Sequence, residues 1–182
     1  MKPVELRTAR LVLDQPTMDD VDLVTGYCQD PLFEKYMVTP WPYQRSDAEQ
    51  YLGTVIPIHW EDDSEYSWAL RLEGELIGLI GFRTKVRDIG YWLGAPHRGR
   101  GYMPEAVSAV VDWVFARDSA DILWECVPGN ISSASVARKA GFTFHGLGPA
   151  LYATRGGEET TAWRGSLATT DSREPKAGWP TE

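Results

Sequence analysis

The stretch HRGRGYMPEA, residues 97–106, places a histidine, two arginines and two glycines directly before an apolar segment. Pro104 suits the first turn of a helix, where a missing N–H costs no hydrogen bond. That turn leaves N–H groups unpaired and carries about half a positive charge. Gly99 and Gly101 allow the backbone to come close to a ligand. The pattern predicts a loop that holds a phosphate or pyrophosphate.

The charges around this loop favour a polyanionic ligand. Between Arg83 and Arg100 there are five basic residues and one acid, Asp88, in a chain whose net charge is −8. The overall negative charge excludes a nucleic-acid partner and favours a cationic substrate. The loop lacks the Gly-Lys-Ser/Thr of a Walker A motif, and Pro104 stands where the dinucleotide fingerprint needs its third glycine. From the loop alone, a glycine-rich turn with solvated arginines stays open as the alternative.

The segments around the loop alternate between strand and helix patterns, which predicts one mixed α/β domain at 1–168 and a flexible tail at 169–182. The amphipathic pattern at 104–118 predicts a helix, and the apolar run at 122–127 predicts a buried central strand. Residues 33–45 predict an ordered loop, and Pro57 is expected to end or kink the helix before it. Strands are expected at 7–16, 67–72, 76–83, 88–94, 122–127, 142–146 and 160–168, and helices at 17–30, 46–56, 104–118 and 133–141.

Three motifs occur in order along the chain: IGYWL at 89–93, an R-x-x-G-x-M loop at 98–103, and N-x-x-S…K-x-G-F at 130–142. With them the sequence resembles the GNAT N-acetyltransferase superfamily, and within it the ribosomal-protein (Rim-type) N-terminal acetyltransferase branch, over residues 5–168. The resemblance implies a mixed, mostly antiparallel sheet that splays at the coenzyme A site, flanked by about four helices. Met103 departs from the pattern, which has Gly or Ala there, but its backbone N–H can still donate.

The resemblance implies acetyl-CoA as the co-substrate. Its pyrophosphate would lie on the amides of 98–103, and its pantetheine arm along 89–93, where that strand separates from 122–127. An open strand edge offers N–H and C=O groups to such an arm, and N–H groups near Leu93 could hold the oxyanion. The expected contact residues are Trp92, Leu93, Arg98, Gly99, Arg100, Gly101, Tyr102, Met103, Asn130, Ser133 and Lys139.

Acetyl transfer to an amine also needs a proton acceptor for the amine and a proton donor for the departing thiolate. The resemblance assigns Ser133 as that general acid, although a helix cap explains a serine there equally well. Asn130 either bonds the pantetheine arm or starts the turn. The base is not identified. Glu34 and Tyr152 are weak candidates, and an amine that arrives neutral and loses its proton to water is the remaining option.

The acceptor is expected to be a primary amine, either a protein or peptide N-terminus or a small cation such as an amino sugar or polyamine. Trp41 and Tyr43 would wall its site in this branch, with loop packing as the alternative role. A second class of function stays open: a non-catalytic acyl-CoA-binding sensor or interaction domain.

The remaining features of the sequence concern the cysteines, possible metal ligands, the cellular location and the oligomeric state. Cys28 and Cys126 are expected to be reduced core thiols. The three histidines lack metal-ligand spacing, so no metal is predicted. Without a signal peptide or an apolar run of membrane length, we expect a cytoplasmic protein with no membrane partner. The aromatic content is compatible with a homodimer but does not require one.

Overall fold

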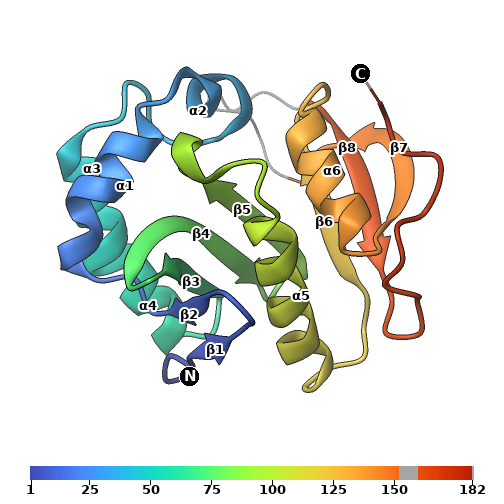
Figure 1. The fold of residues 1–182 in the computed structure, drawn as a ribbon, viewed down its shortest axis with the longest axis horizontal. Helices are drawn as coiled ribbons and strands as arrows, with labels where there is room; N and C mark the ends of the chain where they lie inside the picture. The colour runs from blue at the N-terminus through green and yellow to red at the C-terminus, as the bar shows by residue number, and fades with distance from the viewer. Residues whose placement is uncertain (152–159, 182) are drawn as a thin grey trace.

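The computed structural model describes residues 1–151 and 160–181. Within them, eight strands form one open sheet in the order β1-β2-β3-β4-β5-β6-β8-β7 (Figure 1). The β5–β6 pair is parallel and the other neighbouring pairs are antiparallel, which confirms the predicted fold class. The strands are β1 (Leu6–Arg7), β2 (Val12–Asp14), β3 (Glu65–Leu72), β4 (Glu75–Arg83), β5 (Asp88–Leu93), β6 (Ile122–Cys126), β7 (Thr143–Pro149) and β8 (Thr161–Leu167).

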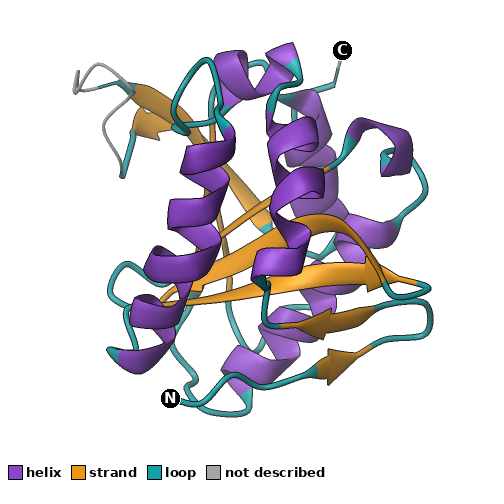
Figure 2. Cartoon of the chain, turned by 90° about the vertical axis from the view of Figure 1, so that its left-hand side faces the viewer, coloured by secondary structure: helices purple, strands orange, loops and turns teal. Residues whose placement is uncertain are grey.

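Six α-helices lie around this sheet in the described residues, against about four expected: α1 (Val21–Cys28), α2 (Pro31–Tyr36), α3 (Arg45–Gln50), α4 (Ile56–Glu61), α5 (Tyr102–Phe115) and α6 (Ile131–Lys139). Helices α1 to α4 gather at the N-terminal half of the sheet, whereas α5 packs against β4 and β5, and α6 against β6 (Figure 1). The view in Figure 2 shows helices lying across the sheet. Helices α5 and α6 therefore stand at the point where β5 and β6 meet.

The expected loop at 33–45 was partly wrong, because the structure contains a helix, α2, that begins at Pro31. The Asp30 side chain caps this helix by accepting a hydrogen bond from the Leu32 N–H (2.9 Å), and Pro31 occupies the first turn. Both features favour a helix start. The aromatic and proline residues that follow α2 are typical of a loop, and for that reason the sequence did not predict the helix.

The helix expected at 46–56 is present, but it begins one residue earlier and Pro57 does not end it. It starts at Arg45, where the Gln44 N–H donates to Asp47 Oδ2 (2.7 Å). It then runs through a π-helical segment at 51–55 and continues beyond Pro57 to Glu61. Because proline has no N–H for the usual helical bond, a locally wider turn before it lets the helix continue.

The first expected strand, 7–16, is divided into β1 and β2, which pair with each other around a tight turn. Thr8 stabilises that turn, because its Oγ1 accepts a hydrogen bond from the Leu11 N–H (2.9 Å). The turn places Thr8 and Arg10 beside the start of α5 rather than inside the sheet.

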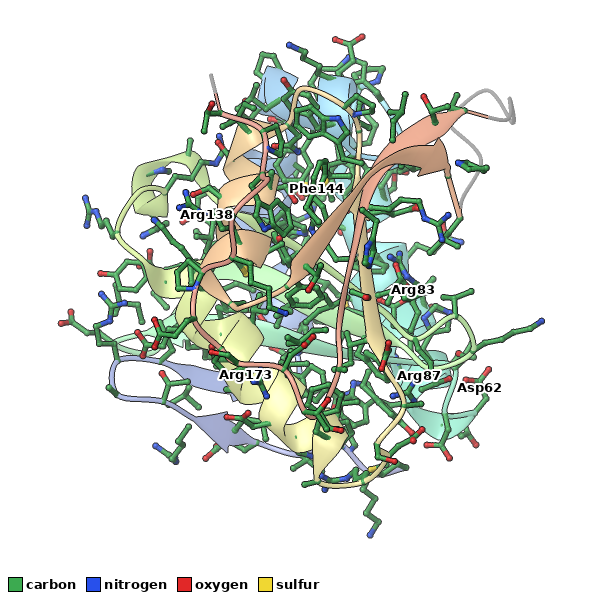
Figure 3. All side chains as sticks on the ribbon, turned by 90° about the vertical axis from the view of Figure 1, so that its right-hand side faces the viewer. Asp62, Arg83, Arg87, Arg138, Phe144 and Arg173 are labelled. Atoms are coloured by element: carbon green, nitrogen blue, oxygen red, sulfur yellow. The ribbon has the colours of Figure 1, made fainter. Side chains whose placement is uncertain are left out.

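The C-terminal segment 169–181 lacks helix and strand, but it lies on the domain instead of extending from it as a flexible tail. The Trp179 side chain is only 8% exposed. Its ring centroid lies 5.2 Å from that of Trp124 and 5.0 Å from that of Phe144. Arg173 adds an ion pair with Asp112 of α5 (2.8 Å). Figure 3 shows the segment crossing this side of the molecule, with Phe144 and Arg173 labelled.

Among the described residues, no helix is both long enough and apolar enough to cross a membrane.

Candidate active site

Strands β5 and β6 diverge soon after they meet. They share a single register pair, Asp88 with Leu123, and the Leu123 N–H donates to the Arg87 carbonyl (2.7 Å). On its other side, β6 pairs with β8 along its whole length, from Ile122 to Cys126. The sheet is therefore split between β5 and β6, as the family resemblance implied.

The split exposes one edge of β5. The Gly94 N–H donates to the Ile77 carbonyl (2.9 Å), and backbone groups alternate between the two sides of an antiparallel strand. The same alternation directs the N–H and C=O groups of Tyr91 and Leu93 away from β4 and toward the gap. This edge can receive an extended, amide-containing ligand.

The loop between β5 and α5 has the backbone that its glycines predicted. Gly99 and Gly101 have φ values of 77° and 78°, a region that residues with a side chain rarely adopt. Gly101 is the residue before α5 and supplies no side-chain cap to the first N–H groups of the helix. The Met103 side chain points into the core, where it is buried. The methionine that replaces the Gly or Ala of the family pattern therefore does not displace the backbone at the start of α5.

Arg98 holds this loop in place. Its Nε donates to the Leu93 carbonyl (2.9 Å), and its Nη1 donates to Asp30 Oδ2 (2.7 Å). Burial opposes the charge on Asp30, but hydrogen bonds from the Leu32 N–H and Arg98 outweigh it and lower the pKa of the carboxyl group. The Arg98 side chain thus links β5, the loop and α2.

A cavity of 400 Å³ lies between the β5 edge, the loop, α2 and α6. Arg100 is exposed and does not line this cavity, which differs from its predicted contact role. Helix α2 contributes Leu32, Phe33 and Tyr36, with Met37 beside them, and the sequence did not predict these four because α2 itself was missed. The predicted residues that do line it are Trp92, Leu93, Arg98, Gly99, Gly101, Tyr102, Met103, Asn130, Ser133 and Lys139.

A second cavity, of 710 Å³, opens on the other side of the split. The two cavities meet at Tyr36, Met37, Tyr91, Trp92, Asn130 and Ser133, which line both.

Only part of the acceptor-side prediction reaches the second cavity. Tyr43 lines it, whereas Trp41 packs against the core and is absent from its lining. Glu34 is exposed and lines neither cavity. Tyr152 falls outside the described residues. In the part of the chain that the structure describes, the carboxylates that line the second cavity are Asp47, Glu65 and Glu125. They lie on separate elements, so no local pattern marks them as a group.

Ser133 lies where the cavities meet. Its Oγ accepts a hydrogen bond from Trp124 Nε1 (3.3 Å) and lies 3.4 Å from Tyr91 Oη. Asn130, not Ser133, caps α6, because the Asn130 Oδ1 accepts the Ser133 N–H (3.1 Å). The Ser133 hydroxyl is therefore not used as a helix cap, which was the alternative that the sequence left open.

Two groups beside Ser133 stay protonated. Burial raises the pKa of the Tyr91 phenol, and Tyr91 Oη donates to the Ser133 carbonyl (2.9 Å). Burial also raises the pKa of the Cys126 thiol to about 12. The junction consequently presents neutral hydroxyl and thiol groups to a ligand.

The family model for the GNAT acetyltransferase domain matches residues 10–143. The chain therefore belongs to the GNAT acetyltransferase family and is an acetyltransferase, as predicted. It is 29% identical over 150 residues to the uncharacterized N-acetyltransferase p20 of Bacillus licheniformis, covering 78% of this chain and 84% of the relative.

Two further comparisons concern the branch and the fold. The ribosomal-protein-serine acetyltransferase of Escherichia coli is 32% identical over 80 residues, covering 41% of this chain and 45% of that protein. A solved structure of the microcin C7 self-immunity acetyltransferase MccE, in complex with acetyl-CoA and AMP, matches with a TM-score of 0.75 at 19% identity, over 88% of this chain and 93% of MccE. The relatives of this chain therefore include a ribosomal-protein acetyltransferase, which confirms the resemblance to the Rim-type branch.

Proposed function

We propose that this protein transfers an acetyl group from acetyl-CoA to a primary amine, by direct attack in a complex that holds both substrates. The observation that carries the proposal is the meeting of two cavities at Ser133 and Tyr91. Two substrates that enter from opposite sides of the split would meet there. A binding domain without turnover has no need of the second cavity, so the enzyme is favoured over a sensor.

The first cavity suits acetyl-CoA. At its phosphate end are the uncapped start of α5 and Lys139, which offer N–H groups and positive charge. Along its length runs the open edge of β5, which offers backbone groups to the two amides of the pantetheine arm. The complex of the structural neighbour MccE with acetyl-CoA agrees with this choice of co-substrate.

The junction supplies the groups that the reaction needs. The amine nitrogen bonds to the thioester carbonyl carbon, and the N–H of Leu93 or Tyr91 on the β5 edge stabilises the oxyanion. The nitrogen of the tetrahedral intermediate releases its proton to water, the carbon–sulfur bond breaks, and the Ser133 hydroxyl gives its proton to the departing thiolate. Ser133 Oγ donates to Tyr91 Oη (3.4 Å), and the Tyr91 O–H in turn donates to the Ser133 carbonyl, so Tyr91 orients the serine and the serine recovers its proton from water.

The second cavity suits a cationic acceptor. Among the residues that the structure describes, three carboxylates and one guanidinium line it, and that guanidinium, Arg83, is paired with Asp88. The excess of negative charge favours an ammonium group, which then releases its proton to water near these carboxylates. A peptide N-terminus and a small cationic amine, the two acceptor classes expected from the sequence, both carry such an ammonium group.

Calorimetric titration with acetyl-CoA tests the placement of the co-substrate. Lys139→Glu and Arg138→Glu make the same charge change on adjacent exposed residues of α6, but only Lys139 lines the cavity; Arg138 is labelled in Figure 3. We expect micromolar binding that weakens about tenfold in Lys139→Glu, as one lost phosphate contact would cause, and changes less than about twofold in Arg138→Glu. Equal losses in both variants would contradict the placement.

Thiol release from acetyl-CoA in the presence of amines tests turnover. The panel contains short peptides with free N-termini, N-terminally blocked versions of the same peptides, polyamines and amino sugars. Release that requires a free amine supports the enzyme and identifies the acceptor class. Acetyl-CoA binding without release by any amine would favour the sensor.

A further inference from the structure

Arg10, in the turn between β1 and β2, is distant in sequence from the loop between β5 and α5 but contacts that loop at Arg100. Its Nη1 donates to the Arg100 carbonyl (3.0 Å), and its Nε donates to Glu105 Oε2 (2.7 Å). Its guanidinium carbon also lies 4.6 Å from the ring centroid of Tyr102, the first residue of α5. One side chain therefore touches the loop, the first residue of the helix and its first turn.

Glu105 is an unfavourable residue for an anion site. It lies in the first turn of α5, where its negative charge offsets the positive end of the helix dipole and repels an incoming phosphate. Burial opposes its charge, but hydrogen bonds from Thr8 and Arg10 outweigh this and lower the pKa of Glu105. The carboxylate is thus ionised at neutral pH, and its charge has to be balanced locally.

The β1–β2 turn provides that balance. Thr8 Oγ1 donates to Glu105 Oε1 (2.5 Å), and the Arg10 N–H donates to the same oxygen (2.9 Å). Arg10 Nη2 lies 2.6 Å from Glu105 Oε2. Because Nε, Nη1 and Nη2 all contact protein atoms, Arg10 acts on a ligand through the loop and the helix rather than by binding it.

We propose that Arg10 is a positioning residue for the coenzyme A site: it fixes the loop through the Arg100 carbonyl and neutralises Glu105, so that the start of α5 attracts the pyrophosphate. This inference rests on the proposed function, because it assumes that the loop holds the phosphates of acetyl-CoA. It assigns a functional role to the N-terminal hairpin, which contributes no residue to either cavity.

Acetyl-CoA titrations of Arg10→Ala, Glu105→Gln and the double variant test this role. Arg10→Ala leaves the Glu105 charge unbalanced and should raise Kd about tenfold, the size of one unit charge at a partly buried helix N-terminus. Glu105→Gln alone leaves Arg10 unbalanced and should lower Kd, and the double variant should return Kd to within about threefold of the wild type. If the Arg10–Glu105 contact were purely structural, Glu105→Gln would raise Kd, because it also breaks the contact. The double variant would then bind at least as weakly as Arg10→Ala.

Arg7→Ala is the matched control. Arg7 belongs to the same hairpin and is paired with Glu5, and its side chain is 70% exposed. Its removal should leave Kd unchanged. If the wild type binds and Glu105→Gln or the double variant binds more weakly than Arg10→Ala, the electrostatic role is overturned while the proposed function stands. If the wild type does not bind acetyl-CoA, both are overturned.

Discussion

Replacing Ser133 by alanine should separate chemistry from binding. The substitution removes the hydroxyl at the junction of the two cavities but leaves the α6 cap intact, because Asn130 provides that cap. A general acid contributes about 10² to 10⁴ in rate. The coenzyme A thiol has an ordinary pKa of about 8.5, so water can partly replace the serine, and we expect kcat to fall about 100-fold. The acetyl-CoA Kd should change by less than about threefold.

The same substitution carries a stability cost that the assay must allow for. The buried Trp124 indole N–H loses its acceptor when Ser133 Oγ is removed. An unpaired buried donor costs about 1 to 2 kcal/mol, which lowers Tm by about 3 to 6 °C in a chain of this size. Rates should therefore be measured well below the transition, which is followed by circular dichroism.

Thiol release at saturating acetyl-CoA and amine is the assay, with Ser133→Thr as the control that keeps a hydroxyl. We expect Ser133→Thr to retain kcat within about tenfold of the wild type. If Ser133→Ala keeps kcat within about threefold, the serine is not the general acid. If Ser133→Ala loses acetyl-CoA binding as well, its role is in holding the ligand.

Two further predictions concern the packing around this site. Trp179→Ala should lower the free energy of unfolding by about 3 kcal/mol, as expected for a large buried side chain, and urea denaturation measures this; a change below about 0.5 kcal/mol would show that the segment after residue 168 is not bound to the domain. Because burial raises the pKa of both Cys28 and Cys126 to about 12, the native protein at pH 8 should react with iodoacetamide about three orders of magnitude more slowly than the urea-unfolded chain. The rate should rise with pH as thiolate forms. Cys28 is buried and Cys126 is half-buried beside the second cavity, and fast labelling of either thiol in the native protein at pH 8, detected by mass spectrometry, would contradict its raised pKa.

The sequence by itself determined the parts of the site that depend on local chemistry. The left-handed conformations of Gly99 and Gly101 follow from the need for glycine where φ is positive. The helix after them follows from the spacing of its valines, and Val107, Val110, Val111 and Val114 are indeed buried. The order of strands and motifs was enough to predict the family, and the resemblance to that family implied the split sheet.

The tertiary structure decided which distant groups meet. The second cavity collects Asp47, Glu65 and Glu125 from separate elements, and no local pattern marks residues that converge only through the fold. The cap of α6 was decided in three dimensions as well, because Asn130 and Ser133 are both acceptable cap residues by type.

The largest differences arose where tertiary contacts outweigh local composition. The segment after residue 168 is polar and contains prolines, so it resembles a free tail, yet Trp179 is buried between Trp124 and Phe144. Arg10 reads as part of a strand, yet it supports the loop beside α5. In both cases the deciding interactions join residues far apart in the chain, and a pattern within one segment contains no information about them.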